Sequence, residues 1–261
     1  MKGTWALITG ASSGFGRALA EMLAERGVSL LLTARREDRL QKLRDELLAK
    51  HAQRNVQIEN LVFDVRDWRE CEAALKQKAA AVAKVSILIN NAGLARGLES
   101  VAKGSPDDWD QMIDTNVKGL LYITRLVLPH MIERNEGHIV NLGSVAGRWV
   151  LPNTAVYCAT KFAVRAISDA LRMDLMGTKI RVTNMEPGIA ETEFADVRLR
   201  DAAKAAAVYK GITPLSPHDV AEAIVWCLER PPHVNIHEMV IFPTAQANVG
   251  APYLHREQAK G

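Results

Sequence analysis

The chain has 261 residues, 48% of them hydrophobic and 24% charged, which predicts one soluble domain spanning residues 1–261 with a full core. A formal charge of +3 without a block of lysines or arginines argues against a nucleic-acid partner. The sequence contains no run of about 18 apolar residues, so we predict no membrane-spanning helix. The three cysteines, Cys71, Cys158 and Cys227, are widely spaced, so we expect a cytoplasmic protein without a disulfide framework.

Short apolar runs alternate with longer amphipathic stretches along the chain, which is the pattern of βαβ units around a parallel sheet. We predict strands at residues 5–9, 29–34, 56–63, 85–90, 138–142, 180–185 and 238–242. Helices are predicted to begin at Ser105-Pro106 and Ser216-Pro217, each with a capping hydroxyl, a proline in the first turn and an acid at the third position. The predicted fold is α/β, a doubly wound seven-stranded parallel sheet with helices on both faces.

Two segments depart from this alternation. Residues 189–213 are polar, alanine-rich and charged, and they follow a predicted strand and Pro187-Gly188. We interpret them as a lid over the functional site. Residues 244–261 form a C-terminal tail after the last predicted strand.

The first strand leads into a glycine-rich turn containing Gly10, Gly14 and Gly16, and the helical run 17–26 follows it. Glycines let the backbone approach a pyrophosphate, and the helix behind the turn offers free N–H groups and a positive dipole end. A merely flexible turn is the alternative, but a position between a strand and a helix favours a dinucleotide site in a Rossmann fold.

The second strand ends at Arg35-Arg36, about 20 residues beyond the glycines, where NAD sites carry an acid and NADP sites an arginine. A guanidinium group can hold a 2′-phosphate through two hydrogen bonds, whereas a carboxylate would repel it. We therefore predict NADP(H) as the cofactor and assign Glu37 and Asp38 to the start of the next helix. The alternative is that both arginines are solvated surface charges.

Polar and small residues follow the third and fourth strands. Asp64 can accept a hydrogen bond from the adenine amino group, or it can be an ordinary turn residue. In Asn90-Asn91-Ala92-Gly93 the small residues leave room for a cofactor and the amides can fix the turn. Taken alone, this tetrapeptide would indicate only an asparagine-rich turn.

Tyr157 and Lys161 are four residues apart on one predicted helix and therefore share a face. An ammonium group beside a phenol favours phenolate, so we expect Lys161 to lower the pKa of Tyr157. Such a phenol can exchange a proton with an alcohol or a carbonyl. A proton-transfer group beside a dinucleotide predicts hydride transfer by a nicotinamide-dependent oxidoreductase.

Along nearly its whole length the chain resembles the short-chain dehydrogenase/reductase family. The resemblance is carried by residues 9–16, 90–93, 114–116, 143–147, 157–161 and 187–188. It implies that Tyr157 is the general acid/base, that Ser144 orients the substrate oxygen, and that Lys161 binds the nicotinamide ribose. It also implies that Asn116 holds a water linking Lys161 to solvent, although Asn116 could instead mark a helix kink.

The turn chemistry and the resemblance together predict the cofactor contacts and no metal. The expected cofactor-binding residues are Gly10, Ser12, Ser13, Gly14, Phe15, Gly16, Arg35, Arg36, Asp64, Val65, Asn91, Ala92, Gly93, Tyr157, Lys161, Pro187, Gly188, Ile189 and Thr192.

Residues 112–116, 186–194, 197–198 and 233–237 further resemble the NADP-dependent 3-hydroxy acid (serine) dehydrogenases and the related sulfoacetaldehyde reductases. This resemblance implies a cytoplasmic, usually tetrameric enzyme for short polar substrates, although the lid after Arg200 and the tail after Gln246 depart from the pattern. An acidic substrate needs a cationic partner, and we expect Arg148 or Arg198 to bind it together with Ser144 and Tyr157. The alternative is that Arg148 pairs with a structural acid and the lid charges are solvated.

The predicted function is an NADP(H)-dependent interconversion of an alcohol and a carbonyl on a short, acidic substrate. The alternatives are a reductase of neutral ketones, sugars or steroids, and a non-catalytic NADP-binding regulatory protein, which would be expected to lose Tyr157 or Lys161. Helices around residues 105–134 and 154–177 are apolar on more than one face, so we expect a homo-oligomer, either a tetramer or a dimer.

Overall fold

The computed structural model describes residues 1–201, 203 and 208–249, and its strands form one parallel sheet in the order β3-β2-β1-β4-β5-β6-β7. The chain winds outward from β1 to β3 and then outward from β4 to β7 on the other side, which confirms the predicted doubly wound α/β fold. The strands are β1 Trp5–Thr9, β2 Ser29–Ala34, β3 Ile58–Val62, β4 Val85–Asn90, β5 Gly137–Leu142, β6 Ile180–Pro187 and β7 Glu238–Ile241.

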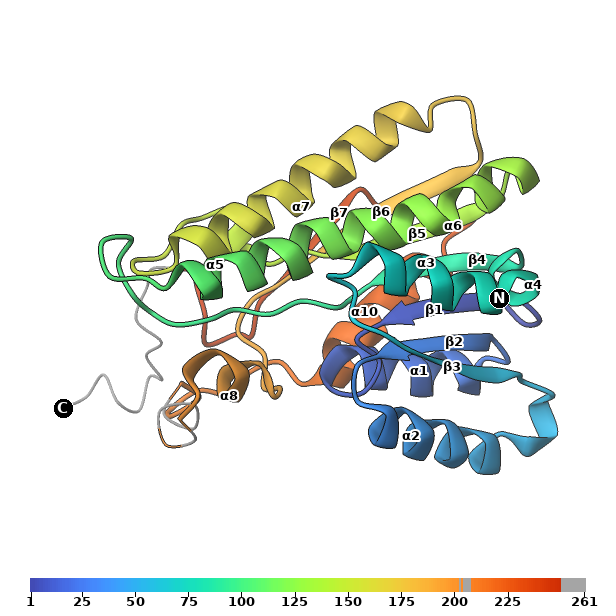
Figure 1. The fold of residues 1–261 in the computed structure, drawn as a ribbon, viewed down its shortest axis with the longest axis horizontal. Coiled ribbons are helices and arrows are strands. Elements are labelled where there is room, and N and C mark those ends of the chain that lie inside the picture. Colours follow the sequence, from blue (N-terminus) through green and yellow to red (C-terminus); the bar gives the residue numbers. More distant parts are fainter. Residues whose placement is uncertain (202, 204–207, 250–261) are drawn as a thin grey trace.

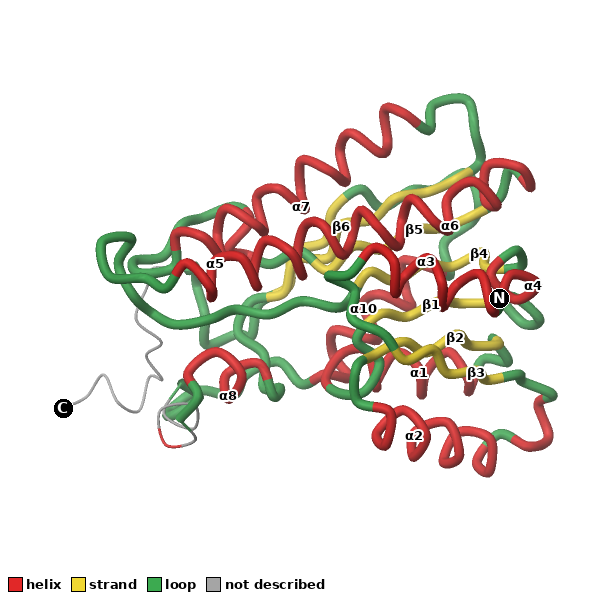
Figure 2. Tube along the Cα trace, in the orientation of Figure 1, coloured by secondary structure: helices red, strands yellow, loops and turns green. Residues whose placement is uncertain are grey.

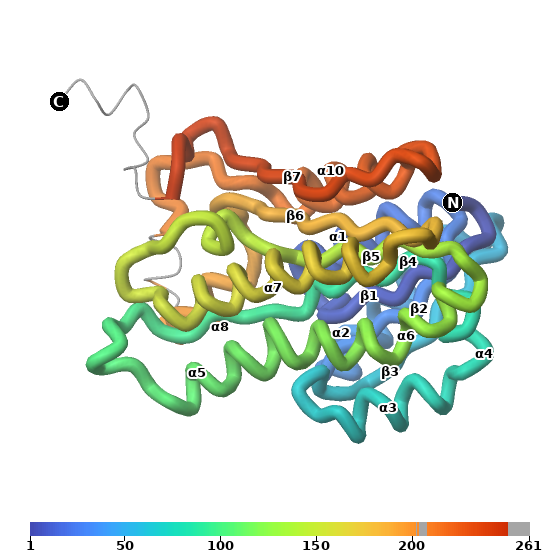
Figure 3. The backbone as a smooth tube through the Cα atoms, turned by 90° about the horizontal axis from the view of Figure 1, so that it is seen from above, coloured from blue at the N-terminus to red at the C-terminus, as the bar shows by residue number. Residues whose placement is uncertain are grey.

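Helices cover both faces of the sheet (Figure 1). The longer helices are α1 Gly14–Glu25, α2 Glu37–Lys50, α3 Trp68–Gln77, α5 Pro106–Ile113, α6 Leu120–Arg134, α7 Ala155–Asp174 and α10 Pro217–Leu228, and the short ones are α4 Ala79–Val82 and α8 Phe194–Leu199. The helices α1, α2 and α10 pack on one face, while α3, α4 and α6 pack on the other. Figure 3 shows α5 and α6 running as one rod beside α7, joined by the π-helical turn Asp114–Gly119.

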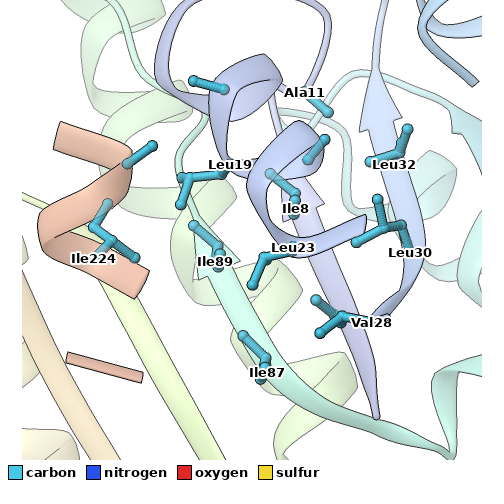
Figure 4. Packing of buried hydrophobic residues seen from close by; sticks show 14 of the residues in the cluster. Ile8, Ala11, Leu19, Leu23, Val28, Leu30, Leu32, Ile87, Ile89 and Ile224 are labelled. Carbon is cyan, nitrogen blue, oxygen red and sulfur yellow. The ribbon is translucent and has the colours of Figure 1, made fainter. Parts of the chain in front are cut away.

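Successive strand residues enter the two cores alternately because side chains of a strand point to opposite faces. In β1, Ile8 packs with α1 and α10, whereas Leu7 packs with α3 and α6. Figure 4 shows the first of these cores, with Leu23 of α1 and Ile224 of α10 packed around Ile8 and Ile89. Burial on both faces explains why these strands read as continuous apolar runs in the sequence.

The element boundaries differ from the predicted ones by a few residues. β3 is shorter than the expected 56–63, although Val56 and Phe63 are buried beside it, and β6 continues two residues further, to Pro187. Ser216 forms the predicted capping box with Asp219. The predicted capping bond at Ser105 is wrong, because its hydroxyl makes no such bond and the first turn relies on proline and acidic residues instead.

All strands are parallel and therefore end at the same edge of the sheet, and α8 lies beyond that edge (Figure 2). The predicted lid begins there, with Ala190 bridging Leu215 and α8 following. Residues 202 and 204–207 of the lid and residues 250–261 of the tail lie outside the described residues. Within the described part of the chain, no helix has the length and apolar character needed to cross a membrane.

A buried histidine on β5 gives the fold a dependence on pH. His138 is buried, with Nε2 2.8 Å from the Thr183 hydroxyl, and burial together with the nearby Arg181 lowers its pKa to about 3. Because the folded pKa lies below the unfolded one, this contribution to stability is complete above about pH 6.5 and is lost as the pH falls. Between pH 6.5 and 5 the free energy of unfolding should fall by on the order of 2 kcal/mol more than in His138→Gln.

Urea unfolding at a series of pH values measures this difference. His233→Gln removes an exposed histidine and serves as the matched control. Parallel pH profiles for wild type and His138→Gln would contradict the prediction.

Candidate active site

The glycine-rich turn is tied to the end of β4 by hydrogen bonds. The Thr9 hydroxyl accepts from the backbone N–H groups of Asn91 and Ala92 at 3.0 and 2.9 Å, and Asn91 Nδ2 donates to the carbonyls of Thr9 and Gly10. Gly10 has φ +64, a conformation that favours glycine. A Cβ on Gly16 would come within 2.5 Å of the Gly10 carbonyl oxygen, so Gly16 allows the close packing of the turn.

A cavity of about 480 Å³ lies at this edge of the sheet. It brings together the turn at 10–15, the ends of the strands, the Ser144 loop, the start of α7 and the lid. Three predicted site residues, Gly16, Asn116 and Arg148, are not among the described residues that line it. The predicted residues that do line it are Gly10, Ser12, Ser13, Gly14, Phe15, Arg35, Arg36, Asp64, Val65, Asn91, Ala92, Gly93, Ser144, Tyr157, Lys161, Pro187, Gly188, Ile189, Thr192 and Arg198.

The two predicted arginines occupy different environments at one end of the cavity. Arg36 donates to the hydroxyls of Ser12 and Ser13, and its Nη1 lies 2.9 Å from the Glu193 carboxylate of the lid. Arg35 is more exposed, with Nη1 3.7 Å from Asp64. This end of the cavity therefore presents guanidinium and hydroxyl groups, which suit a phosphate.

Asp64 has a partner that the sequence analysis did not identify. Its carboxylate accepts from the backbone N–H, Nε and Nη2 of Arg66. Burial alone would raise the pKa of Asp64, but Arg66 and Arg35 lower it below the usual value, so the carboxylate is charged. The guanidinium of Arg66 thus fixes Asp64 at the rim of the cavity.

Tyr157, Lys161 and Ser144 meet at the other end. Tyr157 and Lys161 lie on α7 and are both buried, with Lys161 Nζ 5.9 Å from the centre of the phenol ring. Lys161 Nζ donates to the carbonyl of Leu142 at 2.7 Å. Ser144 caps the short helical turn Val145–Gly147 by accepting from the Ala146 N–H.

The pKa of Tyr157 moves in the opposite direction from the prediction. Burial raises it, while the hydrogen bond with Ser144 and the charge of Arg198 act to lower it. Burial also lowers the pKa of Lys161 to about 8. The predicted lowering by Lys161 is therefore wrong for this structure, because burial disfavours both charged forms and the cation opposing the shift is Arg198.

Asn116 lies in the π-helical turn and binds the segment after β4 to α7. Its Oδ1 accepts from the Leu94 N–H at 2.8 Å, and its Nδ2 donates to the Leu94 carbonyl and to the Thr160 hydroxyl. These bonds engage both polar atoms of the side chain, so the water contact implied by the family resemblance stays a prediction. An asparagine inside a helical stretch was the sequence signal for this irregular turn.

The two predicted substrate arginines have different surroundings. Arg148 is held by the carboxylates of Glu186 and Glu238, which agrees with the alternative that it pairs with structural acids. Arg198 of α8 lines the cavity, with its guanidinium carbon 5.8 Å from the centre of the Tyr157 ring. Its Nε donates to the Gly97 carbonyl at 3.3 Å, which holds the side chain against the loop after β4.

Several cavity residues were missed by the sequence analysis. Phe194 of α8 packs on Tyr157 with ring centres 5.6 Å apart, and its apolar partner Val197 lies one helical turn later. These two apolar residues are three positions apart, and this spacing in the sequence indicated that one face of the helix points into the protein. Gln246, whose Oε1 accepts from the Ile189 N–H at 2.7 Å, carried no local signal. No group of three or more metal-ligating side chains occurs within the described ranges.

The chain is similar in sequence and in structure to known short-chain dehydrogenases. The family model described as short chain dehydrogenase matches residues 4–203. The NADP-dependent 3-hydroxy acid dehydrogenase YdfG of Salmonella typhi is 46% identical over 246 residues, covering 94% of this chain and 96% of that protein. Sulfoacetaldehyde reductase 2 of Chromohalobacter salexigens is 46% identical over 243 residues, covering 92% and 94%. The closed form of serine dehydrogenase complexed with NADP+ has a TM-score of 0.87 at 43% identity, covering 97% and 100%.

Removing the Asn116 side chain should destabilise the fold. In Asn116→Ala the buried backbone N–H and carbonyl of Leu94 lose their partners. We expect the free energy of unfolding in urea to fall by about 2–4 kcal/mol. The control is Gln41→Ala on the exposed face of α2, which should change it by less than about 0.5 kcal/mol. Equal effects of the two substitutions would contradict the structural role of Asn116.

Proposed function

We propose a specific reaction for this chain, which belongs to the short-chain dehydrogenase family and is an NADP-dependent oxidoreductase. The reaction interconverts an alcohol and a carbonyl on a short acidic substrate, of the 3-hydroxy acid/semialdehyde or sulfoacetaldehyde type. The observation that carries the proposal is the position of Arg198, which lines the same cavity as the Tyr157 phenol and the Ser144 hydroxyl. The names of the 3-hydroxy acid dehydrogenase and the sulfoacetaldehyde reductase support this substrate class.

The cavity residues fit NADP(H). The turn at residues 10–13 leads into the 12-residue helix α1 and suits the pyrophosphate, while Arg35 and Arg36 suit the 2′-phosphate. A Cβ on Gly93 would lie 3.6 Å from Lys161 Nζ and 3.3 Å from Asn116 Oδ1, so glycine keeps space open next to the nicotinamide end. The other proposed cofactor contacts are Asp64, Val65, Asn91, Ala92, Tyr157, Lys161, Pro187, Gly188, Ile189 and Thr192. When bound, the cofactor supplies or accepts the hydride.

The chain's own residues manage the proton. In reduction the Tyr157 phenol protonates the substrate oxygen, and in oxidation the phenolate removes that proton. Ser144 donates a hydrogen bond to the oxygen on which negative charge develops. With a pKa of about 8, Lys161 can take up or release a proton near neutral pH beside the phenol. Phe194 packs on the phenol ring and adds an apolar wall beside this exchange.

The substrate's acidic group binds to Arg198. The guanidinium carries several donors, and its Nε bond to the Gly97 carbonyl fixes the side chain while leaving other donors for a carboxylate or sulfonate. Arg148 is assigned no such role, because Glu186 and Glu238 already neutralise it.

We also propose a single domain with a lid, working as a cytoplasmic homo-oligomer. The apolar side chains of Leu121 on α6 and of Phe162 and Met173 on α7 are exposed, which supports a dimer or tetramer. Three free buried cysteines support a reducing compartment.

The test follows NADPH oxidation with malonic semialdehyde, sulfoacetaldehyde and a neutral ketone, with NADH in parallel. Arg198→Met should raise KM for the acidic aldehydes by about tenfold or more, as expected for loss of a charge-assisted hydrogen bond, and change that for the ketone little. Arg200→Met is the matched control, because Arg200 pairs with Asp108 outside the cavity lining. Turnover of neutral carbonyls alone would contradict the substrate class, and unchanged KM values would contradict the role of Arg198.

A further inference from the structure

A carboxylate of the lid lies on the guanidinium that we assign to the 2′-phosphate. Glu193 receives a hydrogen bond from Arg36 Nη1 at 2.9 Å through one oxygen and from Arg39 Nη1 at 2.5 Å through the other. Arg36 and Glu193 both line the cavity, whereas Arg39 is not among the described lining residues. A group of the chain therefore occupies the place of a negatively charged ligand.

Glu193 also joins the cofactor end of the cavity to the catalytic end. It directly precedes α8, whose first residue, Phe194, packs on the Tyr157 ring. Further along the same helix, the Arg198 carbonyl accepts from the Gly97 N–H at 3.1 Å. The lid is thus held at its start by two arginines and at its middle by the loop after β4.

The Glu193 carboxylate and a 2′-phosphate would carry the same sign of charge at the Arg36 guanidinium. Burial alone would raise the pKa of Glu193, but Arg36 and Arg39 lower it, so the side chain is a carboxylate at neutral pH. A 2′-phosphate has a charge of about −1.5 to −2, as other phosphate monoesters do, and it would be repelled by a carboxylate on the same guanidinium.

Glu193 is not needed to orient Arg36. The Nε and Nη2 atoms of Arg36 donate to the Ser12 hydroxyl at 3.3 and 3.2 Å, and Nη2 also donates to the Ser13 hydroxyl at 2.9 Å. These contacts fix the plane of the guanidinium from the glycine-rich turn. The hydrogen bond to Glu193 therefore occupies a donor of Arg36 but is not needed to orient its guanidinium group.

We propose that Glu193 competes with the 2′-phosphate for Arg36 and so determines the affinity of the site for NADP(H). When the phosphate takes Arg36, Arg39 retains the Glu193 carboxylate, and the start of the lid keeps one of its two tethers. The inference rests on the proposed function, because it needs Arg36 as the 2′-phosphate ligand.

The experiment measures binding to the full chain by calorimetry with two probes. Adenosine 2′,5′-bisphosphate carries the 2′-phosphate, and adenosine 5′-phosphate lacks it. Glu193→Gln should bind the bisphosphate about three- to tenfold more tightly than wild type does and the monophosphate equally well. Glu191→Gln, an exposed lid acid two residues earlier, removes the same charge and should change neither affinity. Glu193→Ala should behave as Glu193→Gln does.

The outcomes separate this inference from the proposed function. Arg36→Met tests the 2′-phosphate site alone and should remove the preference of the wild type for the bisphosphate. If that preference is present and is lost in Arg36→Met, but Glu193→Gln binds the bisphosphate no more tightly, the competition is disproved and the site assignment stands. If wild type binds both probes equally, the assignment of Arg36 fails and the competition fails with it.

Discussion

A phenol and an ammonium group are buried side by side on α7. The arrangement of the site follows from the polar and charged groups that replace the water lost by these two side chains. Burial raises the pKa of Tyr157 and lowers that of Lys161, because both charged forms lose hydration. The Leu142 carbonyl binds the ammonium, and the Ser144 hydroxyl acts to lower the pKa of the phenol. Arg198 brings a positive charge to the same ring from the lid. Residues of α8 therefore line the cavity, and one of them, Arg198, acts to lower the pKa of Tyr157.

The sheet places these groups within reach of a cofactor. Parallel strands end at one edge, and the Thr9 and Asn91 hydrogen bonds join the glycine-rich turn to the end of β4. Asn116 then joins the next segment to α7 through Leu94 and Thr160. The spacing between the glycine-rich turn and α7 thus depends on hydrogen bonds made by the side chains of Thr9, Asn91 and Asn116.

Much of the fold and most of the cavity could be predicted because their signals are local. Strands buried on both faces read as apolar runs, and the glycine turn and the Tyr157–Lys161 pair are short motifs. The remainder depends on contacts between distant segments. Arg148 pairs with Glu186 and Glu238, which lie far from it in the sequence. Arg36 likewise pairs with the distant Glu193. The direction of the pKa shift of Tyr157 depends on burial. The four-residue spacing between Tyr157 and Lys161 gives no information about burial.

The central claim is that Tyr157 transfers the proton. The most direct measurement is the turnover of Tyr157→Phe with NADPH and a saturating acidic aldehyde, together with its NADPH affinity. We expect turnover to fall by about 100-fold or more while NADPH still binds. Tyr122→Phe, on α6 against Trp68 and outside the cavity lining, is the control and should keep turnover of the wild-type order. Turnover of Tyr157→Phe comparable to that of Tyr122→Phe would contradict the account.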